Sequence, residues 1–435
     1  MPRVDPVTLF GRAGLTDGDR MLWEHPSGHF GVVGLGAAWS VTVAGTDRFV
    51  QADAAWRALL ADASGGEAET DRWGTGPLAM GGFAFAPAGP AGAEWEGYPP
   101  GMLVLPRCSV ATVDGQSWIT LSMVVGAGTD SPAVAEAGVW EGVRACADAI
   151  DAGGPGPAAG AADLSVEELL PARIWKETVR DAAAAVRDGI LRKVVLARGI
   201  RVRALGLDPV RALWRLRAAY PDCTLFAVAR GDRCFLGATP ERLVRVLGKE
   251  IAVMAVAGSA PRGATEEEDR HLGEMLRASP KDRIEHAVVV SAVRDALAAL
   301  CTEISPTPDP VLLRMRNVQH LFTPLAAVLR APRSALELVE LLHPTPAVGG
   351  VPRDGALRWI AEHERLERGW YAGPVGWMDR AGDGEFAVAI RSALLRPAEA
   401  LLFAGCGIVA SSDPDQEYAE SSLKLQSVLS ALNGG

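Results

Sequence analysis

Short apolar runs joined by tight turns are the feature that most constrains this chain. Residues 224–239 read TLFAVARGDRCFLGAT, two apolar halves separated by Gly231-Asp232, and residues 241–258 repeat the arrangement around Gly248. A Gly-Asp pair between two strand-like runs is typical of a β-hairpin. Because hairpins join neighbouring strands in opposite directions, the sequence predicts sheets that are largely antiparallel and flanked by helices.

Helical patterns separate these strand-like runs. We expect helices near 131–151 and at 165–190, 209–219, 265–278, 280–302, 333–342, 353–366 and 414–432. Acidic residues after Ser165 suit the start of the 165–190 helix, because they favour the positive end of the helix dipole. Further strands are expected at 193–204, 312–325, 371–379, 385–396 and 400–409.

One glycine- and proline-rich stretch divides the chain. Residues 152–163, AGGPGPAAGAAD, have no periodic apolar pattern and are typical of a linker. We therefore expect an N-terminal β-rich region at 1–163, integrated in the fold, and a second region at 164–435 that carries the chemistry. The apolar runs before the linker hold few candidate catalytic groups.

Composition excludes several classes of function. The net charge is −10 and no basic stripe is present, so binding to nucleic acid is not expected. The first residues lack the pattern of a signal peptide, and no apolar run reaches 18 residues, so we expect a cytoplasmic protein without a membrane span. The six cysteines form no CxxC pair, which favours reduced, mostly buried thiols over a metal site or disulfides.

Two pairs of carboxylates suggest a metal site. Asp282 and Glu285 are three residues apart, as are Glu417 and Glu420, and both stretches are predicted helices. Residues at this spacing share one helical face. Two acidic faces brought together need a cation between them, and Mg²⁺ prefers such oxygen ligands. Two solvated helix faces are the alternative, which spacing alone favours.

Lys193 and Glu241 are candidates for proton transfer. Lys193 opens the apolar run KVVLAR, and a lysine removed from water favours its neutral form and can act as a general base. A lysine reaching into solvent from the edge of a strand is the alternative. Glu241 can act as a general acid if burial raises its pKa. Alternatively, it pairs with Arg242 or Arg245 on the surface.

A further group of residues is suited to an anion. Arg391 lies within an apolar run, where a buried arginine needs an anionic partner. Gly405 and Gly407 follow a predicted strand and allow close approach to the backbone, although a tight turn explains them equally well. Lys424 follows Glu420 by four residues, so a structural Glu–Lys pair is its simplest reading. His320 taken alone is more often a structural histidine than a catalytic one.

Considered in order, these segments resemble the chorismate-utilising enzymes, the family of anthranilate, aminodeoxychorismate, salicylate and isochorismate synthases. The resemblance is dense over residues 170–432 and looser before them, in WEHPSGHFGVVGLGAA and GGFAFAP. It implies an α+β fold of two large, mainly antiparallel β-sheets packed together with helices on the outside. The matching segments are KVVLAR, GATPERLV, AVAGSAPRG, KDRIEHAVVV, NVQHLFTPL, LHPTPAVGGVPR, RGWYAGPVGW, AVAIRSALL and LFAGCGIVASSDPDQEYAESSLK.

The resemblance also assigns roles to residues. It implies that Lys193 activates water, that Glu241 protonates the leaving hydroxyl, and that His320 lies beside the side chain of the substrate. Chorismate carries two carboxylates; one would lie on Arg391 and the other would be held by Mg²⁺. The implied substrate-binding residues are Gly258, Ser259, Ala347, Val348, Tyr371, Ile390, Arg391, Gly405, Gly407 and Lys424. The implied metal ligands are Asp282, Glu285, Glu417 and Glu420.

Departures within the family favour isochorismate synthase. Lys193 is similar to the lysine of the water-using members, and Ala257 stands where aminodeoxychorismate synthases carry a lysine. Ala347, in HPTPA, is characteristic of isochorismate synthases, whereas salicylate synthases tend to carry Thr. Tyr371 and Ser259 depart from that pattern, so a salicylate synthase, which also eliminates pyruvate, is the alternative.

A non-catalytic chorismate-binding subunit is a third reading, against which the complete set of candidate catalytic residues argues. The expected partners are chorismate and isochorismate, and the resemblance favours a monomer. The pathway that the product would enter stays open between menaquinone, siderophores and specialised metabolites.

Overall fold

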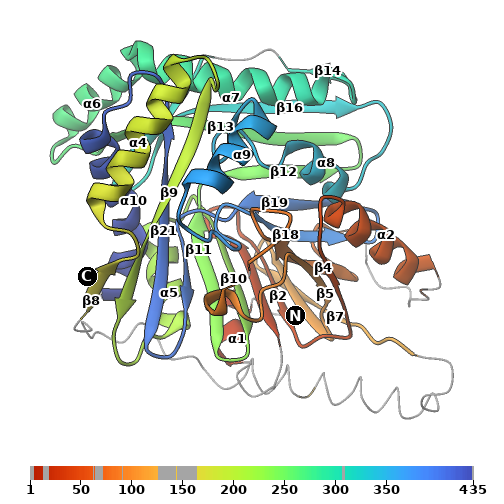
Figure 1. The fold of residues 1–435 in the computed structure, drawn as a ribbon. Coiled ribbons are helices and arrows are strands. Elements are labelled where there is room, and N and C mark those ends of the chain that lie inside the picture. The colour runs from red at the N-terminus through yellow and green to blue at the C-terminus, as the bar shows by residue number, and fades with distance from the viewer. Residues whose placement is uncertain are drawn as a thin grey trace.

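The computed structural model describes residues 4–12, 19–61, 63, 72–90, 92–125, 144, 164–305 and 309–433 (Figure 1). The expected linker at 152–163 lies outside the described residues, as does the helix expected near 131–151 apart from Arg144. Among the described residues, two large β-sheets form the body of the molecule, and every strand pair within them is antiparallel. The predicted sheet architecture is therefore confirmed.

The larger sheet has eleven described strands, in the order β17-β9-β21-β20-β11-β10-β1-β2-β6-β7, with β8 pairing beside β9. Strands from the start of the chain extend it, because β1 pairs with β10. Its strands are β1 (Arg20–His25), β2 (Phe30–Leu35), β6 (Cys108–Val113), β7 (Gln116–Leu121), β8 (Ser165–Glu168), β9 (Lys193–Arg203), β10 (Thr224–Arg230), β11 (Arg233–Thr239), β17 (Gly350–Val351), β20 (Ser392–Leu395) and β21 (Glu399–Ile408).

The second sheet has ten described strands, in the order β14-β16-β13-β12-β19-β18-β4-β5-β3, with β15 beside β16. Here too an early strand, β4, pairs with a late one, β18. Its strands are β3 (Trp39–Val43), β4 (Leu78–Phe83), β5 (Gly101–Leu105), β12 (Arg242–Leu247), β13 (Glu250–Pro261), β14 (Cys301–Ile304), β15 (Val311–Arg314), β16 (Val318–Leu329), β18 (Pro374–Asp379) and β19 (Gly384–Val388).

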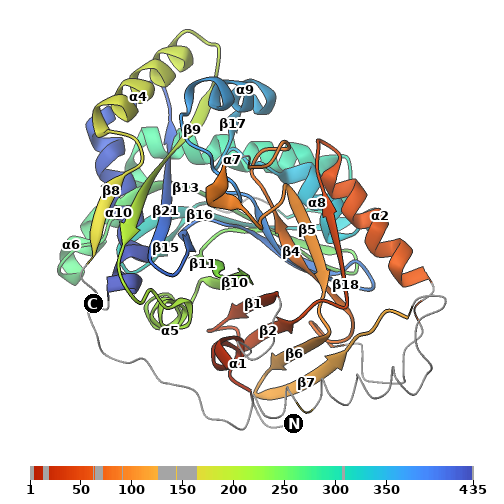
Figure 2. The ribbon, with the colours of Figure 1, turned by 60° about the horizontal axis from the view of Figure 1, so that its bottom comes forward.

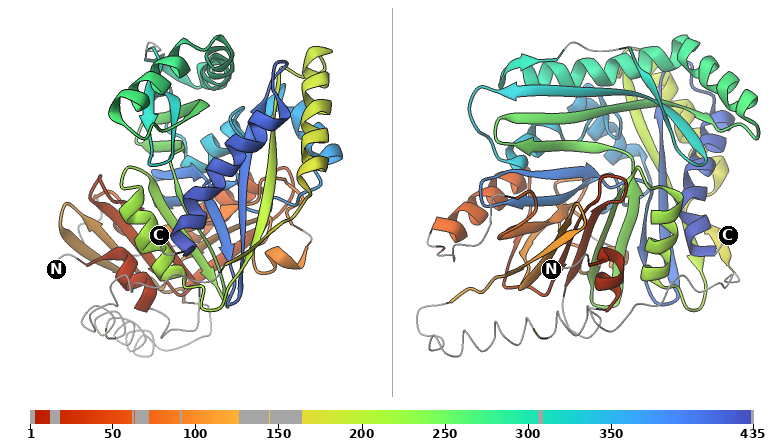
Figure 3. Two further views of the ribbon diagram at one scale, coloured as in Figure 1. Left: turned by 90° about the vertical axis from the view of Figure 1, so that its left-hand side faces the viewer. Right: turned by 180° about the vertical axis from the view of Figure 1, so that it is seen from behind.

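Helices lie on the outside of the two sheets (Figures 1 and 2). Helix α7 lies along β13, and α10 lies along β21, as the two views of Figure 3 show. The helices are α1 (Pro6–Arg12), α2 (Arg48–Ala61), the short 3-10 turn η2 (Ala93–Trp95), α4 (Ala172–Arg187), α5 (Pro209–Ala219), α6 (Glu266–Ala278), α7 (Pro280–Ala298), α8 (Ala335–Leu342), α9 (Arg353–His363) and α10 (Pro414–Asn433). None of these described helices has the length and apolarity needed to cross a membrane.

Aromatic side chains join the two sheets. Trp23 and Phe30 come from the larger sheet and Trp377 from the second, and all three are buried in one cluster. The rings of Phe30 and Trp377 lie 5.8 Å apart. Contacts of this size account for a large share of core stability, so the sheets are held as one packed unit.

Three element predictions were wrong in detail. Residues 165–168 form strand β8 and the helix begins only at Ala172, because Pro171 lacks an amide donor and restricts the residue before it. The single strand expected at 312–325 is the pair β15 and β16. The strand expected at 385–396 is two strands, β19 and β20, which belong to different sheets. The change occurs at Arg391, whose φ of 51° interrupts the extended backbone.

Candidate active site

The candidate site lies where β9 and β21 approach helices α7 and α10. Lys193 is the first residue of β9, and its side chain is only 1% exposed. Its Nζ lies 2.9 Å from Glu285 Oε1, on α7. The alternative of a lysine reaching into solvent is therefore wrong. The buried amino group is held in one position by this contact, as a positioned proton-transfer group requires.

Gly405 and Gly407 form part of the wall of this site. Both lie in the ladder between β21 and β9, opposite Ala197 and Val195. A Cβ at Gly407 would lie 2.3 Å from Glu285 Oε1 and 2.7 Å from Lys193 Cε. Strand β20 pairs only with residues 400–402 of β21, so beyond that point the second edge of β21 has no partner among the described strands. Close approach, not a turn, explains these glycines.

The four predicted metal ligands lie on α7 and α10 among lysines. Glu285 contacts Lys193, Glu417 Oε1 lies 3.0 Å from Lys281 Nζ, and Glu420 Oε1 lies 2.5 Å from Lys424 Nζ. The fourth ligand, Asp282, accepts a hydrogen bond from the hydroxyl of Ser279. The two acidic faces therefore do not point into solvent; they share one partly buried cluster in which three lysines meet four carboxylates.

The charges of this cluster are not fully balanced. Burial raises the pKa of Asp282, and Glu285 and Glu420 raise it further. Burial and the neighbouring Glu420 also raise the pKa of Glu417. Both shifts mean that negative charge is disfavoured where it stands, and a bound cation would relieve this. An all-carboxylate set of donors fits a hard cation such as Mg²⁺.

Cys406 lies next to these carboxylates. Its sulfur, one oxygen of Glu417 and one oxygen of Glu420 all lie within 4.8 Å of one another. The thiol donates a hydrogen bond to the backbone oxygen of Glu417, 3.3 Å away. Burial raises its pKa well above the ordinary value, so the group stays a neutral thiol. Neutral thiols are poor metal ligands, so we do not count Cys406 among the donors. The other described cysteines are buried, as expected.

Glu241 lies in the link between β11 and β12. It is buried, so the alternative of a surface pair with an arginine is wrong. Burial raises its pKa to about 7, although Lys193 and a hydrogen bond from Thr345 act in the opposite direction. The hydroxyl of Thr345 is 3.5 Å from Glu241 Oε1. A carboxyl group with this pKa can hold a proton near neutral pH and release it, as a general acid must.

His320 and Arg391 form a buried pair. Arg391 Nη2 lies 3.1 Å from His320 Nε2. Because a guanidinium can only donate, Nε2 must accept and the ring proton must sit on Nδ1. His320 Nδ1 lies 3.1 Å from the oxygen of Gly258 and 3.0 Å from Ser259 Oγ. Burial, followed by the charge of Arg391, lowers the pKa of His320 to about 3, so the ring stays neutral.

This pair is connected to the carboxylate cluster. Ser259 also hydrogen-bonds to Glu420. Burial alone would raise the pKa of Glu420, but Lys424 and this hydrogen bond lower it. Lys424 Nζ makes a further hydrogen bond of 2.9 Å to the oxygen of Gly405. The Glu420–Lys424 pair is thus present, and Lys424 also contacts the strand that carries the two glycines. Arg391 Nε is buried without a hydrogen-bond partner among the described residues, so one donor remains for an anion.

The remaining predicted substrate-binding residues are Tyr371, Ile390, Ala347 and Val348. Tyr371 is buried, its ring stacks on Phe403 at 5.1 Å, and burial raises its pKa to about 12, so its hydroxyl stays protonated. A Cβ at Gly405 would lie 3.2 Å from the Tyr371 hydroxyl. Ile390 directly precedes Arg391. Ala347 and Val348 lie in the link 343–349 between α8 and β17, which also carries Thr345.

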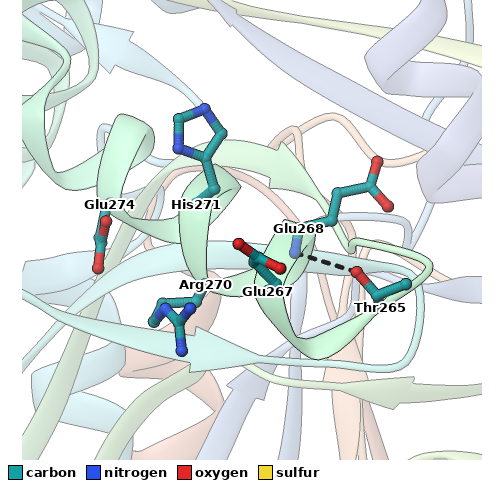
Figure 4. Close-up of a pocket in the computed structure, with 6 residues that line it drawn as sticks. All are labelled: Thr265, Glu267, Glu268, Arg270, His271 and Glu274. Atoms are coloured by element: carbon teal, nitrogen blue, oxygen red, sulfur yellow. Dashed lines mark hydrogen bonds between the residues drawn. The ribbon is translucent and has the colours of Figure 1, made fainter.

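A surface depression elsewhere contains none of the predicted residues. It lies along α6 and is lined by Thr265, Glu267, Glu268, Arg270, His271 and Glu274 (Figure 4). At its start, Glu268 N donates the helix-cap hydrogen bond to Thr265 Oγ1, at 3.2 Å. A wide opening lined by solvated charges of a helix lacks the enclosed, convergent groups of an active site.

Sequence reasoning missed two residues of the site. Lys281 directly precedes Asp282 and neutralises Glu417, and Thr345 holds Glu241. Both lie inside segments that carried the resemblance, KDRIEH and HPTPA. The position next to assigned residues was the only signal available, because the pairing partners lie far away in the sequence.

Comparison with known proteins identifies the family of this chain. The profile of the chorismate binding enzyme family matches residues 1–433. The chain is 40% identical to the salicylate biosynthesis isochorismate synthase of Pseudomonas aeruginosa, over 99% of this chain and 88% of that protein. It is 34% identical to the isochorismate synthase MenF of Bacillus subtilis, over 99% and 92% of the two chains.

A solved structure has the same fold. The structure of MenF, the menaquinone-specific isochorismate synthase from Escherichia coli, matches with a TM-score of 0.79 at 26% identity, and the match covers 98% of this chain and 91% of that one. The family profile, the two relatives and the fold agree over nearly the whole length. This chain therefore belongs to the chorismate binding enzyme family.

Proposed function

We propose that this protein is an isochorismate synthase that converts chorismate to isochorismate with Mg²⁺. The observation that carries the proposal is its similarity, over 99% of the chain, to two proteins that bear this name. The buried Lys193 and Glu241 support it, because they supply an acceptor and a donor of protons at one site.

In the proposed reaction, neutral Lys193 removes a proton from a water molecule as that water attacks carbon 2 of the ring. The double bonds shift, and the hydroxyl on carbon 4 leaves with the proton of Glu241. No covalent intermediate with the protein is needed. The pKa of about 7 for Glu241 favours this assignment, because the donor is then substantially protonated at neutral pH.

The two substrate carboxylates would be held at opposite ends. Arg391 would bind one of them through its unpartnered Nε, while His320 keeps the guanidinium in place. The other would lie at the cluster of Asp282, Glu285, Glu417 and Glu420. A bound Mg²⁺ would neutralise that carboxylate and polarise it.

The test is a product assay with purified protein, chorismate and Mg²⁺, with and without EDTA. We expect isochorismate without pyruvate, and loss of turnover on chelation. Equimolar pyruvate together with salicylate would establish the salicylate synthase instead. Absence of any chorismate turnover with Mg²⁺ present would leave a binding protein.

Two variants test the assigned residues. Lys193→Ala and Glu241→Gln should each lower kcat by at least about 100-fold, since each removes a proton-transfer group. Exposed residues of the same types provide matched controls, Lys249→Ala and Glu250→Gln, which should keep full activity. Full activity in Lys193→Ala or Glu241→Gln would remove that residue from the mechanism.

A further inference from the structure

A buried ion pair beside the site has no assigned role. Glu364 and Arg368 follow α9, and each side chain is only 4% exposed. Two parallel contacts join them, Arg368 Nε to Glu364 Oε1 at 2.6 Å and Nη2 to Glu364 Oε2 at 2.7 Å. A bidentate pair of this kind fixes the plane of the guanidinium.

The remaining hydrogen bonds of this pair go to two backbone segments. Arg368 Nη2 donates to the oxygen of Val195 at 2.8 Å, and Nη1 donates to the oxygen of Val348 at 2.9 Å. Glu364 Oε2 accepts from the amide of Ala197 at 2.6 Å. The pair thus connects strand β9 to the link 343–349.

These contacts replace a missing stretch of β-strand. On this edge of β9, β17 pairs with Lys193 and Val194, and β8 pairs with residues 200–203. Val195 and Ala197 lie in the gap, where the ladder would leave buried backbone groups without partners. Unsatisfied buried groups cost free energy, so the side chains of Glu364 and Arg368 complete the edge.

The pair joins the strand that carries Lys193 to the link that contacts Glu241. Lys193 begins the strand on one side of the contact. The link on the other side carries Thr345, which hydrogen-bonds to Glu241. Val195 N and the oxygen of Gly349 are joined at 2.8 Å as well, so the link is held to β9 at adjacent points. A shift of Val348 relative to Val195 would therefore change the separation of acid and base.

We propose that Arg368, held by Glu364, is a positioning residue that sets the distance between Lys193 and Glu241 across the substrate. This inference rests on the proposed function. Arg368 contacts backbone oxygens and Glu364, and it acts through the two segments that it joins. A misplacement of reacting groups by about 1 Å can lower a rate by about 100-fold.

The test uses the double variant Arg368→Met/Glu364→Gln, which leaves no lone buried charge. We expect kcat to fall by about 100-fold with KM for chorismate changed less than about threefold. The matched control is Glu385→Gln, which breaks another buried ion pair, between Glu385 and Arg242, outside the link and β9. We expect this control to lower the melting temperature about as much as the double variant does, and to leave kcat unchanged.

The positioning role and the proposed function can fail separately, and different results would show which one has failed. A wild-type kcat in the folded double variant, or an equal loss in Glu385→Gln, would overturn the positioning role. A wild-type protein without turnover would instead refute the proposed function. In that case, amide hydrogen exchange still tests the connection. Exchange in 343–351 and 193–197 must rise in the double variant and not in the control, and unchanged exchange there overturns the inference.

Discussion

Burial disfavours the ionised form of the Glu241 carboxyl group, so the stability of the folded protein depends on pH. Its pKa is about 7 in the folded protein because of burial, against 4.5 ordinarily. The folded state therefore holds its proton more tightly than the unfolded state does. Stability contributed by the protonated form is lost as the pH rises from 4.5 to 7, and the loss, roughly 3 kcal/mol, is complete above that window.

Glu241→Gln removes this penalty because the amide cannot ionise. We expect the variant to melt at a higher temperature than the wild type at pH 8 and at nearly the same temperature at pH 4.5. Thermal melts of both proteins in EDTA at the two pH values measure the difference. A gap in melting temperature that is the same at both pH values would contradict the pKa assigned here.

At the scale of single residues, the sequence indicated which residues are candidates for the site but not what surrounds them. The segments that carried the resemblance singled out Lys193, Glu241 and Arg391. Whether Lys193 reached solvent or lay buried against Glu285 could not, because its partner lies 92 positions away in the sequence and only the fold brings them together.

At the scale of elements, strand β21 leaves space in the candidate site because it carries glycines there, which have no side chain. Gly407→Ala would place a methyl group 2.3 Å from Glu285 Oε1 and 2.7 Å from Lys193 Cε, both inside the site. We expect a loss of turnover of at least about tenfold without loss of the fold, since the charged pair must shift. Steady-state kinetics and circular dichroism measure the two effects.

The control is Gly355→Ala in helix α9. There the nearest atoms to a new Cβ lie 3.4 Å away, an ordinary contact. Alanine is the better helix former by about 1 kcal/mol, so this variant should gain stability and keep its activity. Turnover at the wild-type level in Gly407→Ala would mean that the wall of the site has room to spare.

The break at Arg391 illustrates what element prediction could not see. The run AVAIRSALL is apolar on both sides of Arg391 and Ser392 and carries no glycine or proline, so it indicates one strand. In the structure its two halves belong to two sheets. A positive φ at a residue other than glycine is uncommon, and only tertiary contacts, here with His320, maintain it.

At the scale of the whole molecule, one carboxylate links the two sheets. Glu385 of β19 contacts Arg242 in its own sheet and His25 of β1 in the other, at 3.0 Å. Burial alone would raise its pKa, but His25 and Arg242 outweigh burial and lower it to about 2. The stabilisation is therefore present above pH 4.5 and is lost as the pH falls from 4.5 to 2.

Glu385→Gln should therefore lower the melting temperature most at pH 7, where loss of one partner of a buried pair costs roughly 3–5 kcal/mol. The difference from the wild type should shrink between pH 4.5 and pH 3. Melting curves of the two proteins across this range provide the measurement. A difference that stays constant down to pH 3 would show that the contact contributes through shape and not through charge.

The overall architecture could be predicted because the hairpins indicated antiparallel pairing and the resemblance implied two large sheets. The division near residue 163 stays a prediction, since residues around it lie outside the described ranges. Which early strand pairs with which late strand could not be predicted, because apolar strands of similar length carry no mark of their partner.

These long-range pairings have a consequence for how the chain is made. Strand β1 borders β10 and strand β4 borders β18, which leave the ribosome some 200 and 300 residues after them. The first strands to be synthesised thus wait, with apolar faces uncovered, until most of the chain has emerged. In a living cell, this protein would depend on chaperones during translation more than a chain of the same length built from consecutive hairpins.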